Sequence, residues 1–272
     1  MKNKKIYHYI ILTVLLLSVS MTYAQDAGSV GELAKKLANP VASLISVPIQ
    51  TNSDFGIGEL EGSRFTANVQ PVLPIRLSDD LTLITRAVIP IISQQNVTGI
   101  GNTETGLSDV VLSGFFSPTP KAGGLIWGFG PAFLVPTATE DFLGTKKFGV
   151  GPTAVALKQT KGGITLGALV NQIWSVAGDS DRADVNQFFF QPFIVKNWPS
   201  GAGVSAVFEF TQNWEGNTTN LMFNPNVSGI TSVGKQKVSF SVGPKFNLIA
   251  PSETRFDFGM RAQISFLFPK AP

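Results

Sequence analysis

The chain has 272 residues, of which 14% are charged and 43% are hydrophobic. Soluble proteins average about 25% charged residues, so this composition argues against an ordinary soluble globule. The mean hydropathy is positive, +0.19, yet beyond the N-terminal leader no run approaches the roughly 18 apolar residues of a transmembrane helix. A chain that is apolar on average but nowhere continuously apolar is typical of a membrane β-barrel.

Residues 1–24 have the pattern of a secretory signal peptide. Three lysines between residues 2 and 5 precede an apolar stretch from Ile10 to Val19, and Ala24 supplies a small residue at the expected cleavage site. An uncleaved signal anchor is the alternative, which the shortness of the apolar stretch disfavours. The sequence therefore predicts export.

Removal of this leader changes the charge balance. It carries three of the 21 basic residues and none of the 18 acidic ones, so the remaining chain has 18 of each sign. That balance gives no indication of nucleic-acid binding. The one histidine, His8, also leaves with the leader, and the chain contains no Cys. The residues therefore predict no metal site, no cofactor and no disulfide.

The segment 25–39 is predicted to precede the barrel in the periplasm, and the barrel is predicted over 40–272. Within the segment, Ser29 to Ala38 favours one short helix, because its apolar side chains recur at helical spacing. The helix could be a periplasmic linker, lie at the membrane rim or lie in the mouth of the barrel.

Apolar and polar residues alternate in segment after segment beyond residue 40, which is the pattern of strands with one greasy and one wet face. We expect an all-β fold, an antiparallel transmembrane β-barrel of about 12 strands, most about ten residues long. The segments lie near 41–50, 64–75, 81–91, 108–117, 124–136, 148–158, 163–176, 186–197, 202–212, 219–233, 237–249 and 255–268.

The last segment is the clearest. One face carries Phe256, Phe258, Met260, Ala262, Ile264, Phe266 and Phe268, and the other carries Arg255, Asp257, Gly259, Arg261, Gln263 and Ser265. Leu267 breaks the wet face here, as Val72 does in an earlier segment. The greasy face is predicted to meet outer-membrane lipid.

Connections between the segments alternate in length. Long links at 51–63, 93–107, 137–147 and 177–185 alternate with short ones such as 77–80 and 198–200. Short periplasmic turns and longer external loops are typical of outer-membrane barrels. Localisation in the outer membrane of a Gram-negative bacterium is therefore predicted.

Proline recurs inside the segments although it cannot donate to a strand ladder. By the face assignment, all of these prolines point toward lipid, and each should leave a carbonyl unpaired or mark a bulge. Tight bends beside glycine are the expected cause. The positions are Pro71, Pro131, Pro152, Pro192, Pro225 and Pro244.

Several motifs in this order resemble the outer-membrane transporter family labelled for a "MetA-pathway of phenol degradation". They are Asn39–Pro48, Leu83–Pro90, Leu107–Asp109, Trp127–Pro131, Leu134–Ala138, Gln187–Phe193 and Phe266–Lys270. The resemblance implies an outer-membrane barrel for uptake of small molecules, with aromatic compounds among the candidates, and it brings no catalytic residues.

Charges on the wet faces are the candidate functional residues. An Arg or Lys facing lipid at the midplane costs about 2–4 kcal/mol, so these side chains should face the lumen. The predicted pore-lining residues are Arg86, Glu209, Lys245, Arg255, Asp257 and Arg261, of which the last four could form one ion cluster.

Two functions remain open from the sequence. The first is a passive outer-membrane channel for small molecules, with hydrophobic or aromatic compounds as candidates, in which the lumen charges select solutes. The second is a closed barrel, filled by ion pairs, with a structural or surface-binding role. No enzyme is predicted, because the chain that remains after removal of the leader has no His and so lacks the usual general base. The oligomeric state is not predicted.

Overall fold

The computed structural model describes residues 27–268 except residue 122, so the predicted leader at 1–24 lies outside the described residues. Helix α2 spans Ala27–Leu37, and a 3-10 turn, η1, spans Asp141–Leu143. No helix in this part of the chain has the length and apolar character to span a membrane. The strands are β1 (Ile45–Ile57), β2 (Gly62–Val69), β3 (Val72–Arg76), β4 (Leu81–Gln95), β5 (Thr103–Leu107), β6 (Val110–Pro118), β7 (Ile126–Val135), β8 (Lys147–Gln159), β9 (Ile164–Gly178), β10 (Asn186–Asn197), β11 (Gly203–Asn213), β12 (Thr218–Val233), β13 (Gln236–Ile249) and β14 (Phe258–Phe268).

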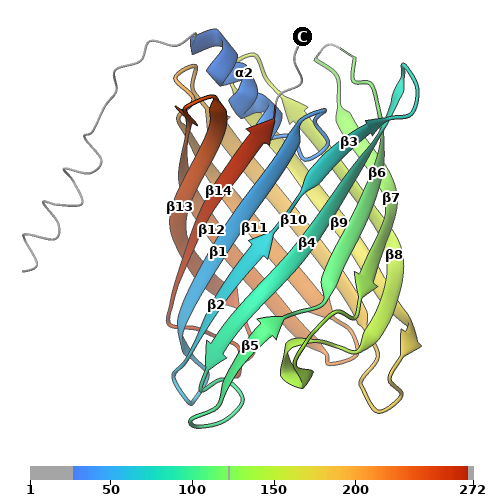
Figure 1. The fold of residues 1–272 in the computed structure, drawn as a ribbon, viewed down its shortest axis with the longest axis vertical. Helices are drawn as coiled ribbons and strands as arrows, with labels where there is room; N and C mark the ends of the chain where they lie inside the picture. The colour runs from blue at the N-terminus through green and yellow to red at the C-terminus, as the bar shows by residue number, and fades with distance from the viewer. Residues whose placement is uncertain (1–26, 122, 269–272) are drawn as a thin grey trace, which may run out of the picture.

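These strands form one closed antiparallel barrel (Figure 1). From β6 to β14 each strand pairs with the next in sequence, and β14 pairs with β1 from Phe268↔Ile45 to Phe258↔Phe55. β2 and β3 share one crossing of the wall, as do β5 and β6, since both members of each couple pair with β4. The 14 strand segments therefore make 12 crossings, which confirms the predicted fold class and strand number.

Two ends of the barrel differ. The helix end carries α2, the end of β14 and the turns between β3 and β4 and between β10 and β11, and the loop end carries η1 and the links that follow β1, β4, β7 and β9 (Figure 1). The long predicted links at the loop end are shorter than expected, because β1 runs to Ile57 and β4 to Gln95. The strands continue their pairing beyond the predicted ten residues and absorb much of each predicted loop.

The outer face of the barrel is apolar and the inner face is mixed. Along β13, Phe240, Val242, Phe246 and Leu248 are exposed, while Ser239 and Lys245 between them are buried. This alternation follows from the two-residue period of a strand, which sends successive side chains to opposite faces of the wall.

Prolines and glycines interrupt the strand pairing at positions where the sequence predicts an unpaired carbonyl or a bulge. Ladder pairing skips Pro131 on its β6 side, Pro152 on its β9 side and Pro244 on its β12 side, while the other side of each pairs normally. The glycine before each of these prolines touches the neighbouring strand so closely that an added Cβ would lie 1.7 to 2.0 Å from a carbonyl oxygen. Only glycine allows this approach. Skipped pairing thus accompanies proline at these three positions, as expected, and the expected tight bends beside glycine stay a prediction.

At the helix end the chain folds into the barrel. We call α2 together with residues 38–44 the plug. Val41 and Leu44 lie in it where the sequence predicted the first strand, which begins only at Ile45. Leu33, Ala42 and Leu44 pack against Leu267. Val41 belongs to a buried cluster with inward side chains of β4, β6, β8 and β9, namely Ile84, Phe115, Val155, Leu157 and Leu169. The helix therefore lies in the mouth of the barrel, one of its three predicted places.

The plug explains residues that broke the predicted wet face. Leu267 is 1% exposed against α2 and Leu44, and Val72 packs against the Val41 cluster. Both side chains are apolar and point inward because they contact the plug.

The structure corrects the prediction for Phe256. It was predicted on the greasy face, but β14 begins at Phe258 and Phe256 is buried inside the loop end.

The face assignment can be tested with two adjacent positions of β14. Ile264 is exposed on the outer face, and Gln263 lies on the inner face. In a lipid bilayer Ile264→Arg should lower the free energy of unfolding by about 2–4 kcal/mol, because the new charge meets hydrocarbon. Gln263→Arg should cost much less, and guanidinium unfolding of vesicle-reconstituted protein measures both. Equal losses would show that the faces are assigned the wrong way.

Candidate functional site

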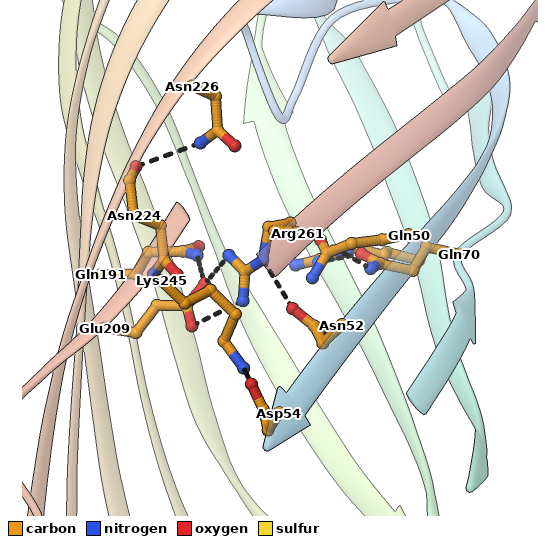
Figure 2. A network of polar contacts seen from close by, with 11 residues as sticks. Gln50, Asn52, Asp54, Gln70, Gln191, Glu209, Asn224, Asn226, Lys245 and Arg261 are labelled. Carbon is orange, nitrogen blue, oxygen red and sulfur yellow. Dashed lines mark hydrogen bonds and ion pairs between the residues drawn. The ribbon is translucent and has the colours of Figure 1, made fainter. Parts of the chain in front are cut away.

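A polar layer crosses the middle of the lumen. Arg261 on β14 donates to both carboxylate oxygens of Glu209 on β11, at 2.6 and 3.0 Å, and to Asn52 Oδ1 on β1 at 2.8 Å (Figure 2). Gln191 Nε2 adds a bond to Glu209 at 3.2 Å. Two further strands, β12 and β13, separate β11 from β14 in the wall. The pair therefore reaches across the interior and narrows it.

A second ion pair lies on the loop side of this layer. Lys245 Nζ on β13 donates to both oxygens of Asp54 on β1, at 2.6 and 2.8 Å, and the side chains are only 7% and 12% exposed. The ring of Phe256 lies 4.9 Å from the same ammonium. Gly259 makes room for this group, since a Cβ there would lie 2.6 to 3.0 Å from Phe256, Asp54 and Lys245.

On the helix side of the layer lies Arg86. Its guanidinium donates to Gln70 Oε1 at 2.5 Å, and Gln70 in turn donates to Gln50 Oε1 at 3.3 Å. Among the described residues no carboxylate lies within ion-pair distance of Arg86, in contrast to Arg261 and Lys245.

The structure brings four of the six predicted pore-lining residues into the lumen. Arg86, Glu209, Lys245 and Arg261 lie on inner faces. Arg255 and Asp257 are exposed in the loop before β14, where Arg255 donates to Ala250 O at 3.4 Å, so the predicted four-residue ion cluster does not form. The cause is that β14 begins after them, at Phe258. The pore-lining role itself stays a prediction.

Sequence reasoning missed Asn52 and Asp54. Both were assigned to a loop, yet they continue the inner face of β1 beyond Gln50. The signal was present, because Gln50, Asn52 and Asp54 are polar at a two-residue spacing. The apolar partners expected between them are small or polar, which obscured the alternation.

At the loop end a cavity of about 480 Å³ opens between the wall and two links. Asp109 anchors its floor by accepting from Thr145 N at 2.6 Å, Thr145 Oγ1 at 2.7 Å and Ala138 N at 3.2 Å. At its rim, Lys147 pairs with Asp184 at 2.9 Å. Hydrogen bonds from Lys147 and Ser175 lower the pKa of the Asp184 carboxyl, so this pair should persist when the pH falls to the ordinary range of aspartate titration.

A smaller cavity of about 210 Å³ lies between the polar layer and the plug. Arg86, Gln50 and Gln70 line one part of it, and Leu44 of the plug and Leu169 of β9 line another. The plug is held over this cavity by Asn197, which donates to Ala34 O at 3.2 Å, and by Gln159, which donates to Lys35 O at 2.7 Å. In order from the loop end, the interior thus contains a cavity, a layer of ion pairs, a second cavity and the plug.

Comparison with solved structures finds a similar fold. The COG4313 outer membrane channel from Pseudomonas putida F1 aligns with a TM-score of 0.67 at 12% identity, over 83% of this chain and 96% of that one. The β domain of the Bordetella autotransporter BrkA gives 0.47 at 9% identity over 83% and 100%, and the CymD monoaromatic hydrocarbon channel gives 0.41 at 10% over 93% and 95%.

Sequence comparison adds nothing further: no family model and no curated protein matches the chain. The first structural likeness therefore establishes the barrel fold, and the resemblance of the motifs to a transporter family stays a prediction.

The buried pair of Lys245 and Asp54 yields a stability prediction. Lys245→Met should lower the free energy of unfolding by about 3–5 kcal/mol, because it leaves the Asp54 carboxylate buried without a partner. Adding Asp54→Asn should restore part of the loss, and a double-mutant cycle from guanidinium unfolding in micelles measures the coupling.

The exposed pair of Arg76 and Asp79 provides the control, since its side chains are 66% and 95% exposed. Arg76→Met should cost less than about 1 kcal/mol. If Lys245→Met lowered the free energy of unfolding as little as Arg76→Met does, Lys245 and Asp54 would not behave as a buried ion pair.

Proposed function

We propose that the protein is an outer-membrane channel for the passive passage of small molecules, exported by the signal peptide at residues 1–24. The apolar outer face suits contact with lipid. The pairing of β14 with β1 closes the barrel, so the outer edges of these two strands form backbone hydrogen bonds, and the polar side chains lie inside. The fold it shares with a bacterial outer membrane channel is consistent with this proposal.

The observation that carries the proposal is the pair of cavities inside the barrel. A barrel with a purely structural role could be filled by side chains, as small barrels are. Here about 480 Å³ at the loop end and about 210 Å³ at the helix end remain open on either side of a layer of ion pairs. A solute that passes from one end to the other would meet charged and amide groups at the narrowest level, where charge and size can be sorted.

The plug closes the helix end of this path, so passage requires it to move. Its contacts are of two kinds: the apolar packing of Leu33, Val41 and Leu44, and two hydrogen bonds to its backbone carbonyls. Short plugs held in this way can open locally at a cost below that of unfolding the barrel. Hydrophobic or aromatic solutes remain candidates through the resemblance of the motifs to a transporter family.

The plug also favours a second candidate, a closed barrel with a structural or surface-binding role. In that case the plug and the ion pairs would fill the interior permanently. Planar-bilayer recording of the purified protein separates the two, since a permanently closed barrel passes no ions.

A disulfide across the mouth tests whether the plug moves. Gly31 on α2 lies beside Pro199, and a Cβ on Gly31 would lie 3.2 Å from Pro199 Cα, so two cysteines there can form a disulfide once the two backbones move slightly apart. Since the chain has no Cys, Gly31→Cys with Pro199→Cys should form one defined bond. Oxidised protein should lose most of its ion current in planar bilayers, and reduction should restore it.

Each single cysteine variant is the matched control and should respond to neither treatment. Identical currents from the oxidised and reduced double variant would mean that solutes do not need the plug to move. No current from any form, including the wild type, would favour the closed barrel.

Charge selection at the polar layer provides another test. Arg261→Ala should leave the Glu209 carboxylate unpaired in the lumen and raise the cation-to-anion permeability ratio severalfold. The reason is that two unit charges 4 Å apart interact by about 1 kcal/mol even in water. The reversal potential in a salt gradient measures this ratio. Arg255→Ala is the control, because Arg255 is exposed outside the lumen. A ratio that stays unchanged in Arg261→Ala would remove the polar layer from the ion path.

A further inference from the structure

The cavity between the plug and the polar layer has a composition that points to a ligand. Two cationic side chains, Arg86 and Lys36, line it and no carboxylate does. Elsewhere in the described lumen, Lys245 and Arg261 each contact a carboxylate directly. The cavity is therefore lined by cations and by no carboxylate, whereas Lys245 and Arg261 in the neighbouring layer each have a carboxylate partner.

Arg86 has hydrogen-bond donors available for a ligand in the cavity. Its guanidinium has five N–H donors, and its assigned hydrogen bond goes to Gln70 Oε1 at 2.5 Å. The bond between Gln70 Nε2 and Gln50 Oε1 turns the carbonyl oxygen of Gln70 toward Arg86. This fixes one edge of the guanidinium and leaves further donors for an acceptor in the cavity.

The remaining surface of the cavity is mixed, since Asn39, Ser46, Gln191 and Gln263 line it together with an apolar group of side chains. Leu37, Pro40 and Leu44 come from the plug, and Val72 and Leu169 come from the wall. A volume of about 210 Å³ exceeds the roughly 150 Å³ in which an apolar protein cavity holds one benzene molecule. The space thus accommodates a single ring or a short chain together with one small charged group.

We propose that this cavity binds small organic monoanions, with a carboxylate on Arg86 and an apolar body against the plug and Leu169. A carboxylate matches the planar fork of a guanidinium, which binds both of its oxygens at once. A neutral solute can accept a hydrogen bond from the guanidinium but leaves its charge unbalanced. A dianion would bring its second charge toward Leu44 and Leu169, because the other cation of the lining, Lys36, is exposed. As the substrate class of the channel, this inference rests on the proposed function; as a binding site, it can be tested without any transport.

The test uses sodium benzoate as the probe and benzamide as its neutral counterpart, with binding to the full mature barrel in non-ionic detergent followed by isothermal titration calorimetry. Wild-type protein should bind benzoate at least tenfold more tightly than benzamide. Arg86→Gln should lose roughly tenfold or more in benzoate affinity, as expected when a charge-assisted hydrogen bond is removed, and should bind benzamide unchanged.

Arg64→Gln is the matched control. Arg64 is also an inward arginine bonded to a glutamine, Gln94 Oε1 at 2.8 Å, but it does not line the cavity. It should bind benzoate like the wild type. Arg86→Lys keeps the charge and should retain the preference for benzoate over benzamide with reduced affinity, which guards against an Arg86→Gln barrel that folds poorly.

Equal affinities for benzoate and benzamide, an equal loss in Arg64→Gln, or no benzoate binding at millimolar concentration would each overturn the assignment. The two proposals can fail separately. A protein that binds benzoate through Arg86 but passes no ions in planar bilayers would keep the site and reject the channel. A conducting protein that binds no benzoate would do the reverse.

Discussion

The hydrogen-bonded pairing of β1 with β14 is the contact on which the rest of the structure depends. It runs over the whole of β14, from Phe258↔Phe55 to Phe268↔Ile45, and it converts a long antiparallel sheet into a cylinder without free edges. Only closure gives each strand a true inside and outside, so the two-residue alternation of the sequence becomes an apolar wall around a mixed interior. In the proposed membrane setting, closure also pairs the outer edges of β1 and β14 where no water is available.

The same seam determines where the plug lies. Because Ile45 pairs with Phe268 at the helix end, the residues just before Ile45 must enter the barrel beside the last residues of β14. Leu44 and Ala42 accordingly pack on Leu267. The Asn39 side chain accepts from Val41 N at 3.0 Å, which turns the chain from α2 into the lumen. Val41 then packs with Ile84 of β4 and Phe115 of β6.

The barrel could be predicted from the sequence because its signal is local. Alternation, the parity of link lengths and the outward prolines all follow from the geometry of one strand and its neighbours. The plug could not be predicted in this way, because Val41 and Leu44 fit an apolar strand as well as a buried segment and only contacts distant in sequence decide between the two. The signals that were present were the exceptions: Leu267 and Val72, apolar on a wet face, both mark where the plug touches the wall.

The prediction of the site was limited by errors in the predicted strand boundaries. The inner charges of β4, β11, β13 and the middle of β14 were found because alternation there is regular. Arg255 and Asp257 were placed inside because the alternation of apolar and polar residues already begins before Phe258, the first residue of β14. Asp54 was missed because the positions that alternate with the inward residues before it, Thr51 and Ser53, are polar. An error of a few residues in a boundary thus transfers a charge between loop and lumen, since the period of two carries no information about where pairing stops.

The interior then separates two electrostatic tasks. Lys245 with Asp54 and Arg261 with Glu209 neutralise each other across strands that are not neighbours, so they brace and narrow the lumen while leaving little net charge at its middle level. Arg86 lies beyond them, held by an amide that orients the guanidinium without cancelling its charge. In the channel proposed above, the paired layer would set the width of the path and Arg86 would set the sign of the solute. Because the plug lines the same cavity as Arg86, a solute held there would contact the segment whose movement opens the helix end.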